Sequence, residues 1–308
     1  MAVRRASSGK NFDTTLAWRP FTDQSRAWWE AGGNGDRLQV GLTEPRPKLY
    51  WVAMPTFQPD ARERDAYREI NRKVGGERQR YLDADAIVID LRHNQGGSSD
   101  WSQDFASALW GADRVKRRMR AYEPNVQVHW RASPGNTAYT AQMAGELAAQ
   151  KQLETAQAVR HTAQEMAAAL ARGDKYFVDR SEVVALAPQD SIENLPSDPP
   201  ELTRPVYVIV PGQCASACLD ALDVFTRFPN TRLIGAPSSA DSTYMEVRVQ
   251  QLESGLSFAI IPVKVYTGRG RGKGQGYTPA TEVDDLSWST ANMLKAVERD
   301  LVARAPKP

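Results

Sequence analysis

The chain has 308 residues, of which 41% are hydrophobic and 25% charged, a composition typical of a globular protein with one large domain or two small ones. Its 39 Lys and Arg residues nearly balance 37 Asp and Glu residues, which argues against nucleic-acid binding because polyanions bind concentrated basic charge, and no apolar run is long enough to span a membrane. Three His and two Cys residues exclude a disulfide scaffold and a zinc ribbon and argue against a multi-histidine metal site, so we expect neither a metal nor a cofactor.

Residues 1–47 are predicted to form an irregular N-terminal segment, because glycines and prolines interrupt them before the first clear strand. The beginning of the chain, MAVRRASSGK, is positively charged but lacks the apolar stretch that follows in a signal peptide. Localisation is therefore open. A periplasmic or secreted protein is expected if a signal peptide is missing from this chain, and a cytoplasmic protein otherwise.

An α/β pattern begins after this segment. Residues 49–54 predict a buried strand, and residues 60–76 predict a helix that begins at an aspartate N-cap and ends at a Gly-Gly pair. Residues 86–91 predict a second strand that is apolar throughout, as parallel strands buried on both faces are. A short helix over 101–109 follows. This order of strand, helix, strand and helix predicts a parallel α/β core.

The pattern is interrupted over residues 112–203, which we interpret as a helical insertion. Residues 136–172 are rich in Ala and Gln and predict one long helix that stops at Gly173. This helix either packs on the core or forms a lid over a cleft. Residues 188–205 contain five prolines and predict an extended connector back to the sheet.

After the insertion the α/β pattern resumes. A strand, a helix and another strand are followed by two longer strands, which a Glu-Ser-Gly turn joins into a hairpin, and by a last amphipathic helix. These elements span residues 206–210, 216–225, 232–235, 243–251, 256–266 and 289–304.

Two of the predicted strands end in residues suited to acyl chemistry. Strand 86–91 leads into Gly96-Gly97, and strand 206–210 leads into Ser216-Ala217. Ligands of open α/β sheets gather at the carboxyl ends of the strands. Glycines let backbone N–H groups approach a substrate oxygen, and a serine at a helix N-terminus lies among unpaired N–H groups that stabilise charge on an attacked carbonyl. The alternatives are an ordinary turn and an ordinary helix cap.

Four segments carry the motifs of one peptidase family. They are residues 88–97 (VIDLRHNQGG), 214–217 (CASA), 233–235 (LIG) and 276–279 (GYTP). The set resembles the "DLR-x-N-x-GG", "SAS-A", "hydrophobic-hydrophobic-G" and "G-x-x-P" motifs of carboxy-terminal processing (tail-specific) and tricorn-like serine peptidases. The resemblance implies an α/β fold, a ClpP/crotonase-like stack of ββα units with an inserted long helical segment, in a peptidase-like domain over residues 48–308.

The same resemblance implies a serine endopeptidase that cleaves unfolded or C-terminal segments of a peptide or protein substrate through an acyl-enzyme. Ser216 is then the nucleophile, and the N–H groups of Ala217 and of Gly96 or Gly97 form the oxyanion hole. We expect no nucleic-acid partner and leave the oligomeric state open. A catalytically silent peptide-binding protein on the same fold is the alternative from another class, and a crotonase-type acyl-CoA enzyme is a third.

The group that takes the proton from Ser216 is not identified by these motifs. Processing peptidases place a general-base Lys downstream of the serine, at the end of a short motif. In this chain the corresponding stretch, residues 235–240, is followed by Asp241 instead of a Lys. Tricorn-like members use a His that precedes the catalytic core, and no His precedes His93 in this chain. His93 and Asp241 are therefore the candidates. A structural hydrogen bond at the strand end is the alternative role of His93.

Two further pairs of residues lie near the predicted site. Cys214 and Cys218 flank the serine, and we expect free thiols, with a disulfide as the alternative in an exported protein. Arg269 and Arg271 belong to a Gly-Arg-rich run and are predicted to clamp the terminal carboxylate of a substrate. A flexible loop is the alternative interpretation of that run.

Overall fold

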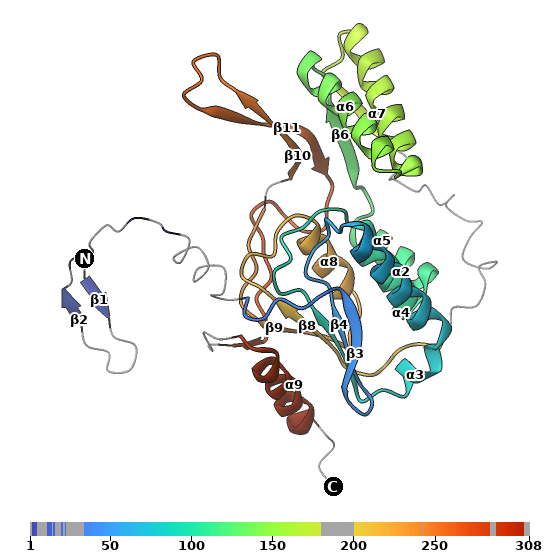
Figure 1. The fold of residues 1–308 in the computed structure, drawn as a ribbon, viewed down its shortest axis with the longest axis vertical. Coiled ribbons are helices and arrows are strands. Elements are labelled where there is room, and N and C mark those ends of the chain that lie inside the picture. Colours follow the sequence, from blue (N-terminus) through green and yellow to red (C-terminus); the bar gives the residue numbers. More distant parts are fainter. Residues whose placement is uncertain are drawn as a thin grey trace.

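A computed structural model describes residues 2–4, 11–13, 34–179, 200–241, 243–283 and 288–304, together with Thr15, Pro20 and Thr22. Figure 1 shows an α/β body from which a long β-hairpin and a pair of helices project on one side. The strands are β1 (Ala2–Arg4), β2 (Asn11–Asp13), β3 (Gly41–Arg46), β4 (Leu49–Ala53), β5 (Ala86–Asp90), β6 (Gln127–Arg131), β7 (Tyr176–Asp179), β8 (Val206–Val210), β9 (Thr231–Gly235), β10 (Tyr244–Gln251), β11 (Phe258–Thr267) and β12 (Thr281–Glu282). The helices are α2 (Ala61–Gly76), α3 (Arg78–Leu82), α4 (Asp100–Trp110), α5 (Ala112–Tyr122), α6 (Pro134–Ala149), α7 (Leu153–Ala171), α8 (Ala217–Phe225) and α9 (Thr290–Arg304).

The body is built on a six-stranded sheet in the order β12-β9-β8-β5-β4-β3. Every neighbouring pair is parallel except β3 and β4, which are antiparallel. Every residue of β4, β5 and β8 is buried, which is why these strands are apolar except for Asp90 at the end of β5. The predicted parallel α/β core is confirmed, while β3 lies inside the stretch predicted to be irregular. Most of that stretch lies outside the described residues.

Helices cover both faces of this sheet. A large core joins one face to α2, α4 and α8, and a smaller core joins the other face to α9, which Figure 1 shows apart from the other helices. The predicted N-cap of α2 is confirmed, because the Asp60 side chain accepts a hydrogen bond from the Glu63 N–H and the Glu63 side chain accepts one from the Asp60 N–H. No helix in the described part of the chain has both the length and the apolar character needed to cross a membrane.

A second sheet, antiparallel in the order β10-β11-β6-β7, carries α6 and α7. Its small core contains Val128, Trp130, Met166 and Val263. The prediction of one continuous helix over 136–172 is wrong, because the chain turns at Lys151, whose φ is 61°, and forms two antiparallel helices instead. The connector predicted for residues 188–205 lies largely outside the described residues.

Candidate active site

The two glycine- and serine-containing segments meet at one edge of the central sheet. β5 and β8 are parallel neighbours, so the residues that follow them leave the sheet at the same edge. A Cβ atom added to Gly96 would lie 2.8 Å from the Ser216 Cβ and 3.1 Å from the Ala217 N. The Gly96 backbone is therefore in contact with the turn that carries the serine.

Ser216 occupies a turn whose backbone is held under strain. It immediately precedes α8 and has φ 54° and ψ −130°. A positive φ in a residue other than glycine costs about 1–3 kcal/mol and persists only where the surrounding structure holds it. The serine is half-buried, and among the described residues its hydroxyl has no hydrogen-bond partner. The turn thus presents a free hydroxyl at the N-terminus of a helix.

The Ser216 turn is held by Asp241 from one side. The Asp241 Oδ2 accepts a hydrogen bond of 2.9 Å from the Ser216 N–H, and the Asp241 Oδ1 accepts one of 2.8 Å from the Arg271 guanidinium. Both carboxylate oxygens are therefore engaged. Asp241 connects the nucleophile turn to Arg271, which lies far from it in the sequence.

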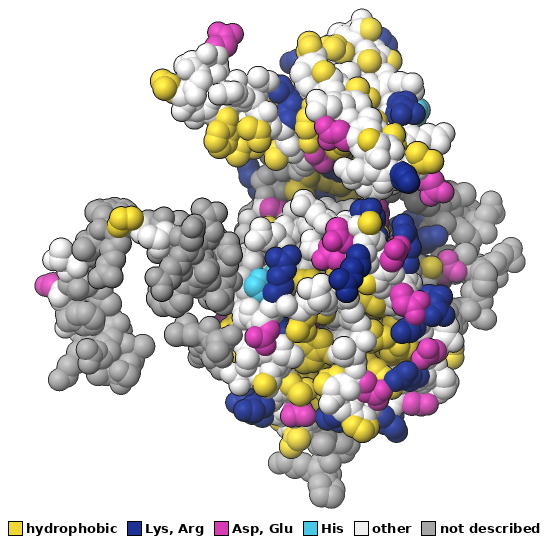
Figure 2. Space-filling view, viewed as in Figure 1, with side chains coloured by type: hydrophobic (Ala, Val, Ile, Leu, Met, Phe, Trp, Pro, Cys, Tyr) yellow, Lys and Arg dark blue, Asp and Glu magenta, His cyan; other side chains and the backbone are white. Residues whose placement is uncertain are grey.

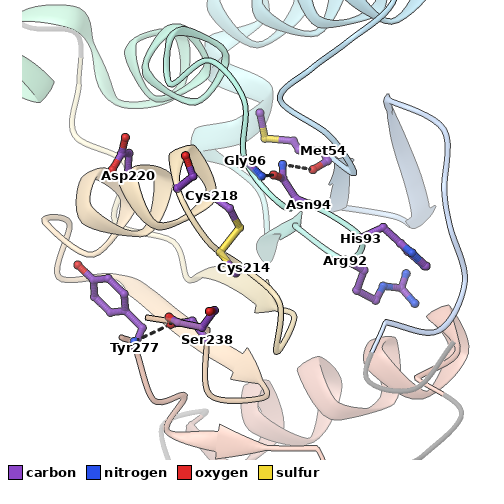
Figure 3. The surroundings of a disulfide bond; sticks show 12 residues. Met54, Arg92, His93, Asn94, Gly96, Cys214, Cys218, Asp220, Ser238 and Tyr277 are labelled. Carbon is purple, nitrogen blue, oxygen red and sulfur yellow. Dashed lines mark hydrogen bonds between the residues drawn. A yellow bond between two sulfur atoms is a disulfide. The ribbon is translucent and has the colours of Figure 1, made fainter. Parts of the chain in front are cut away.

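A disulfide between Cys214 and Cys218 closes the same turn. Figure 3 shows this bond at the start of α8, close to the loop that carries Asn94 and Gly96. The expectation of free thiols is wrong. Both half-cystines are fully buried, and the short loop between them contains Ser216.

Arg271 and Arg269 belong to a buried network of charges behind α8. The Arg271 Nε lies 3.1 Å from both carboxylate oxygens of Asp223, and Arg269 hydrogen-bonds Asp220 and lies 3.4 Å from Asp223. The arginine side chains are only 8% (Arg269) and 4% (Arg271) exposed. The predicted clamp on a substrate carboxylate therefore has no support in this arrangement, because internal carboxylates already occupy both guanidinium groups.

Burial changes the proton affinities in this network. Desolvation raises the pKa of Asp223, against the opposing effect of Arg271 and of a 2.6 Å hydrogen bond from the Tyr277 hydroxyl. Desolvation also raises the pKa of Glu123, which lies beside Arg269. Two arginines thus face several carboxylates, and burial raises the pKa of two of them, Asp223 and Glu123.

The two glycines of the loop differ in their backbone N–H groups: that of Gly96 is hydrogen-bonded, whereas that of Gly97 has no partner among the described residues. The Gly96 N–H donates to the Asn94 Oδ1 at 2.9 Å, and the Asn94 Nδ2 donates to the Met54 carbonyl at 2.8 Å, as Figure 3 shows. The Phe57 N–H donates to the Gly96 carbonyl at 3.2 Å. Because a trans peptide points its C=O and N–H in opposite directions, the Gly97 N–H points away from Phe57.

Other residues of the first motif have structural roles. Arg92 and Asp90 form a buried ion pair of 2.6 Å, and Arg92 also donates to the Trp288 carbonyl at 2.6 Å and to the Thr290 hydroxyl at 2.8 Å. These contacts hold α9 against the end of β5. Asn94, which fixes the glycine loop, is not among the site residues predicted from the sequence. It could have been included, because it is the Asn of the DLR-x-N motif.

His93 does not lie on the serine. Its Nε2 is 2.9 Å from the Gly35 carbonyl and its backbone N–H donates to the Asn34 Oδ1 at 3.0 Å. Figure 3 shows the ring directed away from the disulfide. The alternative role, a structural hydrogen bond at the strand end, is the one found, and the catalytic role predicted for His93 has no support. His129 lies on β6 against Thr267, and His161 is exposed on α7.

The described residues contain no group of three or more His, Cys, Asp or Glu side chains arranged to hold a metal ion. The buried carboxylates nearest to the nucleophile are paired with arginines instead. What this edge of the sheet can support is chemistry by a serine hydroxyl, by backbone N–H groups and by one carboxylate.

Comparison with known proteins identifies the family. The family model described as Peptidase family S41 matches residues 49–283, whereas no curated protein matches the chain. Similar solved structures include mature CPAF (10% identity, 84% of this chain and 52% of that chain, TM-score 0.44). They also include the photosystem II D1 C-terminal processing protease (14% identity, 82% of this chain and 46% of that chain, TM-score 0.34). A third is a lipoprotein from Streptococcus agalactiae (13% identity, 86% of this chain and 69% of that chain, TM-score 0.38).

The chain spans about half the length of the first two of these proteins, 52% and 46%. No activity can be inferred from structures with identities and TM-scores this low, so the family assignment rests on the family model alone. That model covers most of the α/β body, including both segments that form the site. The chain belongs to peptidase family S41.

Proposed function

We propose that this protein hydrolyses peptide bonds in unfolded or C-terminal segments of proteins through an acyl-enzyme on Ser216. The observation that carries the proposal is the contact between the Gly96 backbone and the strained Ser216 turn at the N-terminus of α8. This arrangement supplies a nucleophile and backbone donors within one small volume, as acyl transfer requires. The family assignment favours this reaction over catalytically silent peptide binding.

The oxyanion hole is proposed to consist of the Gly97 and Ala217 N–H groups. Within the described part of the chain neither group has a hydrogen-bond partner, whereas the Gly96 N–H is already taken by Asn94. The Ala217 N–H also lies in the first turn of α8, where the helix dipole stabilises negative charge. Gly96 then serves as the residue small enough to let the loop approach Ser216.

Asp241 is proposed to take the Ser216 proton. It is the titratable side chain that hydrogen-bonds Ser216 in the described structure, where its Oδ2 accepts from the Ser216 N–H at 2.9 Å. The serine oxygen bonds to the substrate carbonyl carbon while its proton passes to the carboxylate. Asp241 then returns that proton to the leaving amine as the C–N bond breaks. Because a carboxylate is a weak base, slow turnover is expected.

Ser216→Ala tests the proposed nucleophile. The variant is expected to lose labelling by a fluorophosphonate probe and to cleave an unfolded, fluorescently labelled casein at least about 1,000-fold more slowly than the native protein. Ser254→Ala, at the exposed tip of the β10–β11 hairpin, is the control and retains both activities. Labelling that persists without Ser216 contradicts the proposal. A native protein that binds casein but neither reacts with the probe nor cleaves establishes the silent alternative.

Asp241→Ala tests the proposed proton acceptor separately from the nucleophile. The variant is expected to lose at least about 100-fold in kcat, which is the usual contribution of general base catalysis. Added formate, acetate and chloroacetate then restore turnover in the order of their basicity, because the rate of proton transfer follows the strength of the base. Equal rescue by all three carboxylates contradicts a proton-transfer role and shows that Asp241 only positions Ser216.

The disulfide suggests an oxidising compartment, the periplasm or the cell exterior, because disulfides persist there and are rare in the cytosol.

The double variant Cys214→Ala/Cys218→Ala is expected to lose about 2 kcal/mol of unfolding free energy, the chain-entropy value for so short a loop. It is also expected to have a lower kcat, because the turn that holds Ser216 is no longer closed by the disulfide. Urea unfolding under oxidising and reducing conditions measures the first effect. An equal stability of the double variant and the oxidised native protein contradicts a bond that supports the site.

A further inference from the structure

The β10–β11 hairpin carries a row of exposed hydrophobic side chains. Figure 1 shows this hairpin as an arm that projects from the body, and Figure 2 shows hydrophobic side chains gathered on it at the upper left. Six large hydrophobic residues of the arm are between 45% and 91% exposed, a degree of exposure that large apolar side chains seldom have in clusters. They are Val247, Val249, Leu252, Leu256, Phe258 and Ile260.

Four of these residues lie on one face of the hairpin. Val249 is directly opposite Ile260 in the strand register, and residues two apart in a strand share a face, which adds Val247 and Phe258. We call these four the arm face. On the opposite face the Arg248 Nε donates to the Asn136 Oδ1 of α6 at 2.8 Å, and Ala259 and Ile261 are half-buried, whereas Gln250 is exposed. The arm face is therefore the more exposed side of the hairpin.

The size of the arm face matches what a dimer needs. Together with the two leucines of the tip, it exposes on the order of 600 Å² of apolar surface, the upper end of the range for the largest patch on a monomer. Two such faces in contact bury roughly 1,200 Å², which reaches the lower end of the range for specific protein–protein interfaces. Because the arm projects from the body, two arms can meet without contact between the bodies.

The charge pattern of the arm favours contact with an identical copy. Residues 249–263 contain no Lys or Arg and a single Glu, Glu253. The arm face itself carries no charge, so a symmetric contact brings no like charges together. An anionic membrane or a nucleic acid attracts Lys and Arg, which this stretch lacks. An extended peptide adds to a sheet edge through its backbone and leaves the arm face uncovered.

We propose that the arm faces of two copies of this chain pack against each other about a two-fold axis. Val249 and Ile260 lie at the centre of this contact, with the sheets stacked face to face at a separation of about 10 Å, as in β-sandwiches. Leu252 and Leu256 at the tip extend the contact along the partner's arm. The proposal is independent of the peptidase activity.

Sedimentation equilibrium over a range of protein concentrations tests the interface. The native chain is expected to have twice the mass of one chain at micromolar concentrations, and Val249→Asp and Ile260→Asp are each expected to raise the dimer dissociation constant at least about 100-fold, because each buries unpaired charge. Val302→Asp is the matched control, since Val302 is 77% exposed on α9 and distant from the arm in Figure 1. This control retains the native mass.

Three results overturn the proposal. A native chain that stays monomeric at all concentrations shows that the faces do not associate. A native dimer that both arm variants retain shows that the interface lies elsewhere. Flotation of the native chain with phosphatidylglycerol vesicles, lost in the arm variants, makes the face a membrane contact. Circular dichroism and thermal unfolding equal to those of the native chain establish that the variants are folded.

Discussion

Gly96→Ala is expected to lower peptidase turnover at least about 100-fold, which is the cost of a misplacement of about 1 Å in a catalytic group. The new Cβ lies 2.8 Å from the Ser216 Cβ and from the Ala215 carbonyl oxygen, closer than real Cβ atoms approach other atoms. The φ of Gly96, 108°, is also a conformation that L-residues rarely adopt. Either the glycine loop or the serine turn must move, and the oxyanion hole opens. Casein cleavage and the rate of fluorophosphonate labelling measure the loss.

Gly212→Ala is the matched control for this prediction. Gly212 belongs to the same nucleophile loop, but a Cβ at this position meets nothing closer than 3.8 Å, at the Pro237 carbonyl oxygen. Near-native activity is therefore expected, with a small gain in stability from the lower entropy of the unfolded chain. If both alanine variants are equally active, the contact between Gly96 and Ser216 is not the feature that holds the site together.

Arg271→Met is expected to cost about 3–5 kcal/mol of unfolding free energy and to abolish activity, because Asp241 loses its arginine partner and Asp223 keeps only the more distant Arg269, at 3.4 Å. The side chains of Arg271 and Asp223 are 4% and 1% exposed, respectively, so water replaces little of the lost interaction. Asp241 also loses the partner that orients it toward the Ser216 N–H. Urea unfolding and casein cleavage measure the two effects.

Two further variants separate this network from surface charge. Arg304→Met breaks an exposed pair with Asp300 on α9, and a cost of only about 0.5 kcal/mol is expected. Asp223→Asn in the Arg271→Met background removes a buried charge that has lost one of its two arginine partners and is expected to restore part of the stability without restoring activity. Equal costs for the two arginine variants, or no recovery in the double variant, contradict a buried network that holds the nucleophile.

The body of the fold is predictable because its information is local. β8 is apolar throughout and β5 is apolar up to its last residue, Asp90. The glycines and the serine lie a few residues beyond these strands, whose carboxyl ends lie at one edge of the sheet because the strands are parallel neighbours. The two strands therefore bring Gly96 and Ser216 together without any need to know the rest of the chain. The same holds for α2, whose N-cap Asp60 is recognisable from its neighbours alone.

The parts that sequence analysis missed depend on contacts between distant residues. β6 pairs with β11 of the hairpin and β7 pairs with β6, and such pairing leaves little trace in a short strand's own pattern. Arg271 was assigned to a substrate clamp because the sequence does not show that Asp223 and Asp241 already bind it. Where related peptidases carry a lysine, this chain has Asp241, and the nearby cation comes from Arg271 instead.

The tie between Ser216 and Arg271 also bears on when activity first arises during synthesis. A nascent chain that has passed Ser216 but not yet reached Asp241 and Arg271 contains the nucleophile without the side chains that hold its turn. The strained conformation of Ser216 persists only where the surrounding structure holds it, so its turn is expected to form late. The proposed peptidase activity is therefore expected to begin only once the C-terminal part of the domain has folded onto α8.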